Sequence, residues 1–141
     1  MINLDKVNLL ECVAGDIDLG QKLKYQVRIT NLTKTPSEGE KSLKFVVGFD
    51  MLSGIENPAV TFRCTFEAEY RCEEGDDMGV LKEHVVVAHL VPFLREFVWN
   101  VTSRMPIGGL MIPPMQTHRM VELYNKRKSE ESAPASAAPV V

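Results

Sequence analysis

The sequence lacks the common motifs of catalytic and cofactor-binding sites. Its 141 residues contain no GxSxG elbow, no GxxxxGK phosphate loop, no GxGxxG dinucleotide fingerprint and no HExxH zinc motif. His84 and His89 are five residues apart, which is a poor helical spacing for a shared metal ion, and no CxxC pair accompanies them. We therefore expect a protein without enzymatic activity, metal or cofactor.

Cysteine is scarce, and positive charge is not in excess. Cys12, Cys64 and Cys72 are odd in number and widely spaced, which argues against a disulfide framework and favours reduced thiols. A formal net charge of −3 offers no basic footprint for nucleic acid. No uninterrupted apolar run reaches membrane-spanning length, and the first residues lack the layout of a signal peptide. We expect a cytoplasmic protein that neither inserts into membranes nor binds nucleic acid.

The sequence does contain the composition of one ordinary globular domain, with 45% hydrophobic and 25% charged residues. In its first half, apolar residues tend to occupy every second position, which is typical of half-buried strands. Four strands are expected, near residues 2–12, 23–30, 43–52 and 62–72. Turns are expected at residues 33–41, 53–58 and 73–77, and short links favour antiparallel neighbours.

The second half changes to helical spacing. Over about residues 80–104 apolar positions recur at three- and four-residue steps, and Pro92 predicts a kink or a short leading segment. A second helix is expected to start around Pro114. We predict an α+β fold with two helices packed on one face of a four-stranded antiparallel sheet, in a domain spanning residues 1–127. Residues 128–141 are small, polar and proline-containing and are expected to form a disordered tail.

The connection between the two helices is unusually apolar for a loop. Loops are normally polar because their backbone stays hydrated, and here glycines and prolines are mixed with large apolar side chains. Two interpretations stay open: these side chains pack onto the domain core, or they contact an apolar partner, to which methionine adapts well. The candidates are Met105, Ile107, Leu110, Met111, Ile112 and Met115.

The segment from Leu90 to Tyr124 resembles the SecB family of bacterial export chaperones. The family pattern has a proline and an aromatic residue followed by Arg-Glu, then Ser/Thr-Arg, a glycine-containing apolar loop, a proline, and a helix ending in an aromatic residue. This chain supplies, in that order, Pro92, Phe93, Arg95, Glu96, Ser103, Arg104, Gly108, Gly109, Leu110, Pro113 or Pro114, Leu123 and Tyr124. Residues 1–72 match mainly in strand order and turn placement.

The resemblance implies an ATP-independent holdase that binds unfolded preproteins in apolar grooves and keeps them competent for export. SecB-type proteins are homotetramers, built as dimers of dimers, and their grooves are framed by a sheet edge, the helix-connecting loop and the second helix. The six loop candidates are thereby assigned to client binding. SecB-like relatives also serve particular clients, including antitoxins. A further alternative is a non-chaperone module whose apolar loop contacts one folded partner.

Two other surfaces are expected. The first helix is apolar on more than one side, which predicts burial in an oligomer beyond what one sheet provides. The residues assigned to that interface are Phe97, Val98, Trp99 and Val101. For the first three, core packing and client contact are the alternatives. SecB proteins contact the motor protein SecA through acidic residues on the exposed sheet face, and Glu11 and Glu67 are the candidates here. Arg63 and Thr65 replace an apolar and an acidic residue of the family, so we expect weaker SecA binding.

Overall fold

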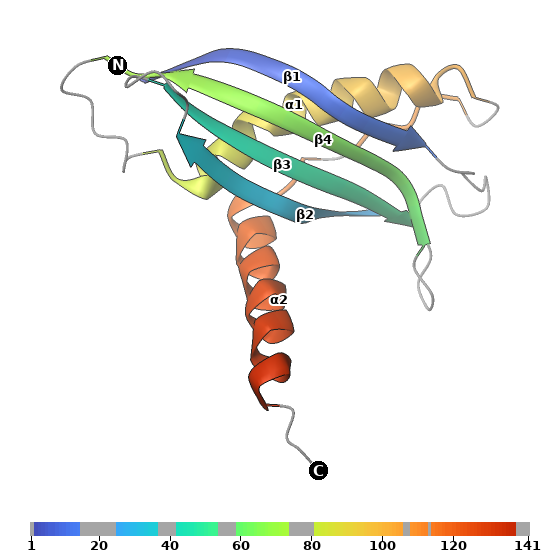
Figure 1. Cartoon of the computed structure of the whole chain (residues 1–141). Helices are drawn as coiled ribbons and strands as arrows, with labels where there is room; N and C mark the ends of the chain where they lie inside the picture. The colour runs from blue at the N-terminus through green and yellow to red at the C-terminus, as the bar shows by residue number, and fades with distance from the viewer. Residues whose placement is uncertain are drawn as a thin grey trace.

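The computed structural model describes residues 2–14, 25–36, 42–53, 59–73, 81–105, 108–112 and 114–137. Four strands are followed by two helices, as the sequence predicts (Figure 1). The elements are β1 (Asn3–Ala14), β2 (Tyr25–Pro36), β3 (Ser42–Ser53), β4 (Ala59–Arg71), α1 (Glu83–Thr102) and α2 (Thr117–Ala137). The expected turn at residues 73–77 lies outside the described residues, apart from Glu73.

The four strands form one antiparallel sheet in the order β1-β4-β3-β2. β2, β3 and β4 follow one another as neighbours, whereas β1 pairs with β4, so β1 and β2 are the two edges. β2 continues to Pro36, although a turn was expected from residue 33. An edge strand tolerates a proline because the missing N–H leaves no gap in a central ladder.

The alternation along β4 separates the two faces of the sheet. Phe62, Cys64 and Phe66 are buried on the inner face, whereas Arg63 and Glu67 point to the outer face. Cross-strand partners share a face, so Cys12 of β1 lies on the inner side, with its Sγ 3.8 Å from that of Cys64. Cys64 and Cys72 are both buried.

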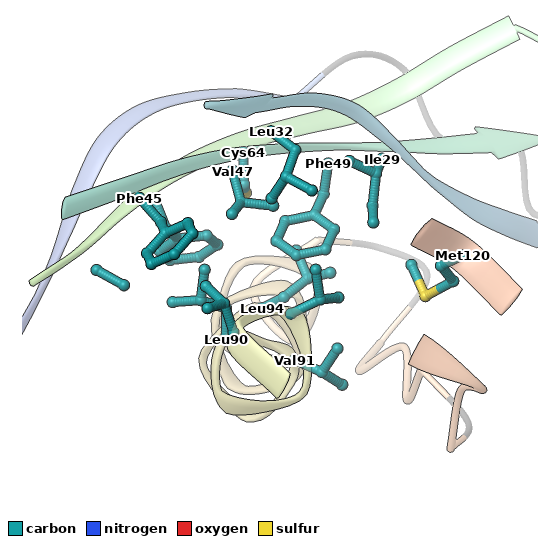
Figure 2. Packing of buried hydrophobic residues seen from close by; sticks show 14 of the residues in the cluster. Ile29, Leu32, Phe45, Val47, Phe49, Cys64, Leu90, Val91, Leu94 and Met120 are labelled. Atoms are coloured by element: carbon teal, nitrogen blue, oxygen red, sulfur yellow. The ribbon is translucent and has the colours of Figure 1, made fainter. Parts of the chain in front are cut away.

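Helix α1 covers the inner face and closes the core. Figure 2 shows Leu90, Leu94 and Val91 of α1 beneath the side chains of Phe45 and Val47 from the sheet. The helix runs without interruption through Pro92, so no separate leading segment forms. It is long and apolar enough to cross a membrane by length and composition, but core helices share that property, and its buried stripe here belongs to the protein core.

Helix α2 begins at Thr117, three residues after Pro114, and packs its first turns at the β2 end of the core. Met120 and Val121 are buried there, and the helix then projects past the sheet (Figure 1). It continues to Ala137, so residues 128–137 are helical where a disordered tail was expected, and residues 138–141 lie outside the described residues. Lys, Glu and Ala are favourable helix residues, so a helix already started on the core can continue through this segment.

Tyr70 makes the core sensitive to alkaline conditions. Its hydroxyl lies 2.8 Å from His89 Nδ1, and burial raises its pKa to about 12 from an ordinary value of 10. The neutral hydroxyl therefore stabilises the fold below pH 10, and that stability, about 2–3 kcal/mol at most, is lost as the pH rises through 12.

We expect Tyr70→Phe to lower the free energy of unfolding by about 1 kcal/mol at pH 8, because the hydrogen bond to His89 is lost. Between pH 10 and 12 the variant should lose less stability than the parent. Urea unfolding measured across this range tests the expectation, and parallel pH profiles for the two proteins would contradict it.

Candidate client-binding site

The loop between the helices is held against α1 by hydrogen bonds with Thr102 and Arg95. Thr102, at the end of α1, accepts a hydrogen bond of 2.8 Å from the Leu110 backbone N–H and donates one of 2.6 Å to the Val98 carbonyl. Arg95 donates from Nε to the Ile112 carbonyl at 2.9 Å. These bonds satisfy loop backbone groups that burial would otherwise leave unpaired, so the loop has one defined path.

The two glycines of the loop have separate structural roles. Gly108 has a φ of 76°, a left-handed conformation that side chains with a Cβ rarely adopt. Gly109 lies against the indole of Trp99, where an added Cβ would approach three ring carbons to between 2.5 and 2.8 Å. The glycine pair therefore lets the loop turn and then pass closely over α1.

We expect Gly109→Ala to displace the indole of Trp99 and to lower stability by about 1–3 kcal/mol. Trp99 is the only tryptophan, so its fluorescence emission reports the displacement directly. Gly108→Ala is the control: it introduces backbone strain of about 1–2 kcal/mol without any contact to the ring, since its Cβ would meet nothing within 4 Å. Unchanged emission in Gly109→Ala would contradict the proposed contact.

Side chains of the fastened loop alternate between the core and the surface. Leu110 and Ile112 are buried in the core, with 7% and 3% of their surface exposed, whereas Met111 between them is 60% exposed. Of the two interpretations left open by the sequence, core packing applies to most of the surface of Leu110 and Ile112, whereas Met111 is available to a partner. Met105 and Met115 are partly buried, and Ile107 lies outside the described residues.

A groove of about 840 Å³ runs between the loop, the edge strand β2 and the start of α2. Leu110 and Ile112 contribute to its floor although they belong to the core, and Met111 and Leu123 are its most exposed apolar side chains. The lining residues are Gln26, Val27, Arg28, Met51, Gly109, Leu110, Met111, Ile112, Met115, Gln116, Arg119, Met120 and Leu123. The groove is predominantly apolar and adaptable, because four of these residues are methionines.

The residues assigned to an oligomer interface divide between core and surface. Val98 is fully buried within the chain, so its assignment to an interface is wrong and the core alternative holds. Phe97 and Val101 are partly buried, and the Phe97 ring lies edge-on to Phe62 with centroids 6.0 Å apart. Trp99 is 42% exposed, although its ring packs over Gly109.

Glu11 and Glu67 lie on the outer face of the sheet. Glu11 pairs with Thr65 across β1 and β4, so both side chains point away from α1. Glu67 accepts a hydrogen bond from Asn8 Nδ2 at 3.4 Å. Arg63 shares this face, and its guanidinium is held by the buried carboxylate of Asp50 at 2.7 and 3.0 Å.

The β2 wall of the groove was not found by sequence reasoning. The sequence around Gln26, Val27 and Arg28 alternates like that of any half-buried strand. Nothing in this local pattern indicates that β2 is an edge strand. Arg119 likewise looks like one of many surface cations on a helix. Their relation to the loop arises only when α2 packs beside β2, where the Tyr124 hydroxyl accepts a hydrogen bond of 3.2 Å from the Leu32 N–H.

Comparison with solved structures identifies the architecture. The Rv1957 SecB-like chaperone of Mycobacterium tuberculosis, solved in complex with a ChAD peptide from the Rv1956 HigA1 antitoxin, matches with a TM-score of 0.59 and 14% sequence identity. The match covers 81% of this chain and 90% of that one. The chain has a SecB-like fold.

Sequence comparisons add nothing to this match. No family model and no curated protein matches the chain. A protein of unknown function from Streptococcus agalactiae matches with a TM-score of 0.45 and 11% identity, over 81% of this chain and 98% of that one. The SecB-like fold is thus shown through strand order and helix placement, and the sequence is a divergent one.

Proposed function

We propose that this protein is an ATP-independent holdase chaperone that binds unfolded preproteins in its apolar groove and keeps them competent for export. The groove carries the proposal, because it exposes Met111 and Leu123 on a SecB-like fold. Exposed apolar surface of this kind is typical of sites for other proteins. No nucleotide is needed for this activity. A protein that binds only the unfolded state of a client increases the unfolded population by mass action and so slows the folding of the client.

The direct test asks whether the purified protein delays the refolding of several unrelated proteins diluted from denaturant, without nucleotide. A holdase slows every one of them in proportion to its concentration. A module dedicated to one folded partner leaves refolding unchanged and binds that partner in its native state. The second outcome would overturn the chaperone proposal.

A chaperone dedicated to an antitoxin is the second candidate. It is favoured by the similar Mycobacterium tuberculosis structure, whose SecB-like chaperone is bound to an antitoxin segment. A dedicated chaperone binds one unfolded segment far more tightly than others, whereas a general one binds many with similar dissociation constants. A panel of unfolded chains measured under one condition separates these two candidates.

We further propose that the protein is a homotetramer. Apolar side chains remain exposed away from the groove, among them Val13, Phe93 and Trp99. A hollow of about 220 Å³ between β1 and α1 is lined by Leu9, Phe93 and Phe97. Burial of these residues between copies of the chain would remove apolar surface that lowers the solubility of a monomer. Several linked grooves would also raise the effective concentration of binding sites for a long client. Light scattering at micromolar concentration should give four chain masses, and a monomer mass would contradict this.

Contact with SecA through Glu11 and Glu67 is proposed to be weak and sensitive to salt. Both carboxylates lie on the outer sheet face, but Arg63 lies on the same face and lowers the local negative charge. Interactions between exposed charges are screened at physiological ionic strength. Titration of SecA at low and physiological salt tests this, and tight binding that ignores salt would contradict it.

A further inference from the structure

We propose that Cys12 and Cys64 form a site of reversible oxidation, where a peroxide converts the two thiols into a disulfide that links β1 to β4. Their Sγ atoms lie 3.8 Å apart, and the two residues are direct partners in the β1–β4 ladder. Both are free thiols in this structure. This chemistry is independent of the proposed chaperone function.

The positions of the two residues allow a bond after a small movement. Directly opposed residues of an antiparallel pair have Cα atoms about 4.5–5.5 Å apart, a separation that a disulfide spans. The sulfur atoms still have to approach from 3.8 Å to a bond length of about 2 Å. Strand β1 can supply this movement, because it pairs on one side only and its register with β4 is irregular between Leu9 and Glu11.

The two thiols differ in accessibility, and this difference sets the order of the reaction. Cys12 is partly buried, whereas Cys64 is fully buried in the core (Figure 2). Hydrogen peroxide therefore reaches Cys12 first: the O–O bond breaks, the sulfur takes one oxygen to form a sulfenic acid, and one water leaves. The sulfur of Cys64 then attacks that of Cys12, the S–O bond breaks, and a second water leaves. The two thiols lose two electrons and two protons, and the peroxide is reduced to two waters.

Burial makes this site slow at neutral pH. It raises the pKa of both thiols above their ordinary value of 9. The thiolate is the reactive form, so the pair stays reduced at pH 7 unless the oxidant is abundant. Between pH 7 and 9 the rate of oxidation should rise about tenfold for each pH unit, because the thiolate fraction does. The site therefore responds to sustained oxidation, unlike a catalytic thiol with a lowered pKa.

The disulfide would fasten a free edge of the sheet. It joins residues separated by 52 positions along the chain, and a link of this span removes conformational freedom from the unfolded chain. The melting temperature of the oxidised protein should therefore rise by about 5 °C or more. Strand β1 is the edge opposite to β2, so the residues that line the client groove stay in place.

Peptide mapping of the full chain tests the site. The protein is treated with hydrogen peroxide at pH 8, its remaining thiols are blocked with N-ethylmaleimide in denaturant, and it is digested with trypsin. Each cysteine falls in a separate tryptic peptide, spanning residues 7–22, 64–71 and 72–82. The expected product joins peptides 7–22 and 64–71, leaves peptide 72–82 with one maleimide, and separates after treatment with dithiothreitol.

Cys72→Ala is the matched control. Cys72 is eight residues from Cys64 along an extended strand, roughly 26 Å, which is too far for a bridge. This variant should form the same linked product with the same rise in melting temperature, whereas Cys12→Ala should show neither. Three results would overturn the proposal: over-oxidised Cys12 beside a maleimide-labelled Cys64, links between chains only on a non-reducing gel, or a linked chain that melts no higher than the reduced one.

Discussion

Replacing Met111 and Leu123 together with serine should abolish most client binding while leaving the protein folded. Their side chains are 60% and 47% exposed in the groove, so the free protein buries only about half of each. Full burial of such side chains contributes about 1.5–3 kcal/mol each, and a client completes roughly half of it. The pair should therefore lose about 1.5–3 kcal/mol of binding, which is roughly 10- to 150-fold in the dissociation constant.

Melting temperature and client binding should be measured on the same preparation. The matched control is Leu10→Ser, an apolar residue on β1 that is 52% exposed and does not line the groove. It should leave client binding within about twofold of the parent, since it removes comparable apolar surface elsewhere. If the groove variant binds clients as well as the parent does, the site is placed wrongly.

Truncation of the neighbouring Leu110 or Ile112 to alanine should lower the free energy of unfolding by about 2–5 kcal/mol. Both side chains are buried in the core beneath α1 and the sheet, and their removal leaves a cavity that the fastened loop cannot close. In a domain of this size such a loss is a large fraction of total stability.

Met111→Ala is the comparison within the same loop. It should change the free energy of unfolding by less than about 0.5 kcal/mol, because the Met111 side chain is exposed and its truncation removes few core contacts. Urea unfolding of the three variants decides the point. Equal losses for Leu110→Ala and Met111→Ala would show that the loop is not held in the alternating arrangement.

Local patterns in the sequence were sufficient to predict the elements of the fold. Alternation along β4 fixed which side chains share a face, since successive residues of a strand point to opposite sides. Three- and four-residue spacing predicted α1, and its buried Leu90, Leu94 and Val98 follow that spacing. The sequence pattern did not predict that α2 continues past residue 128, because that segment lacks the apolar stripe by which an amphipathic helix is recognised.

The sequence by itself determined that an apolar loop joins the helices of an α+β domain. Only the tertiary structure decided which residues of that loop face outward. The Leu110 N–H donates to Thr102 and Arg95 donates to the Ile112 carbonyl. These two bonds hold the loop with Leu110 and Ile112 inward and Met111 exposed, and they join positions separated along the chain. The β2 wall depends likewise on long-range pairing, since β2 becomes an edge only when β2, β3 and β4 assemble.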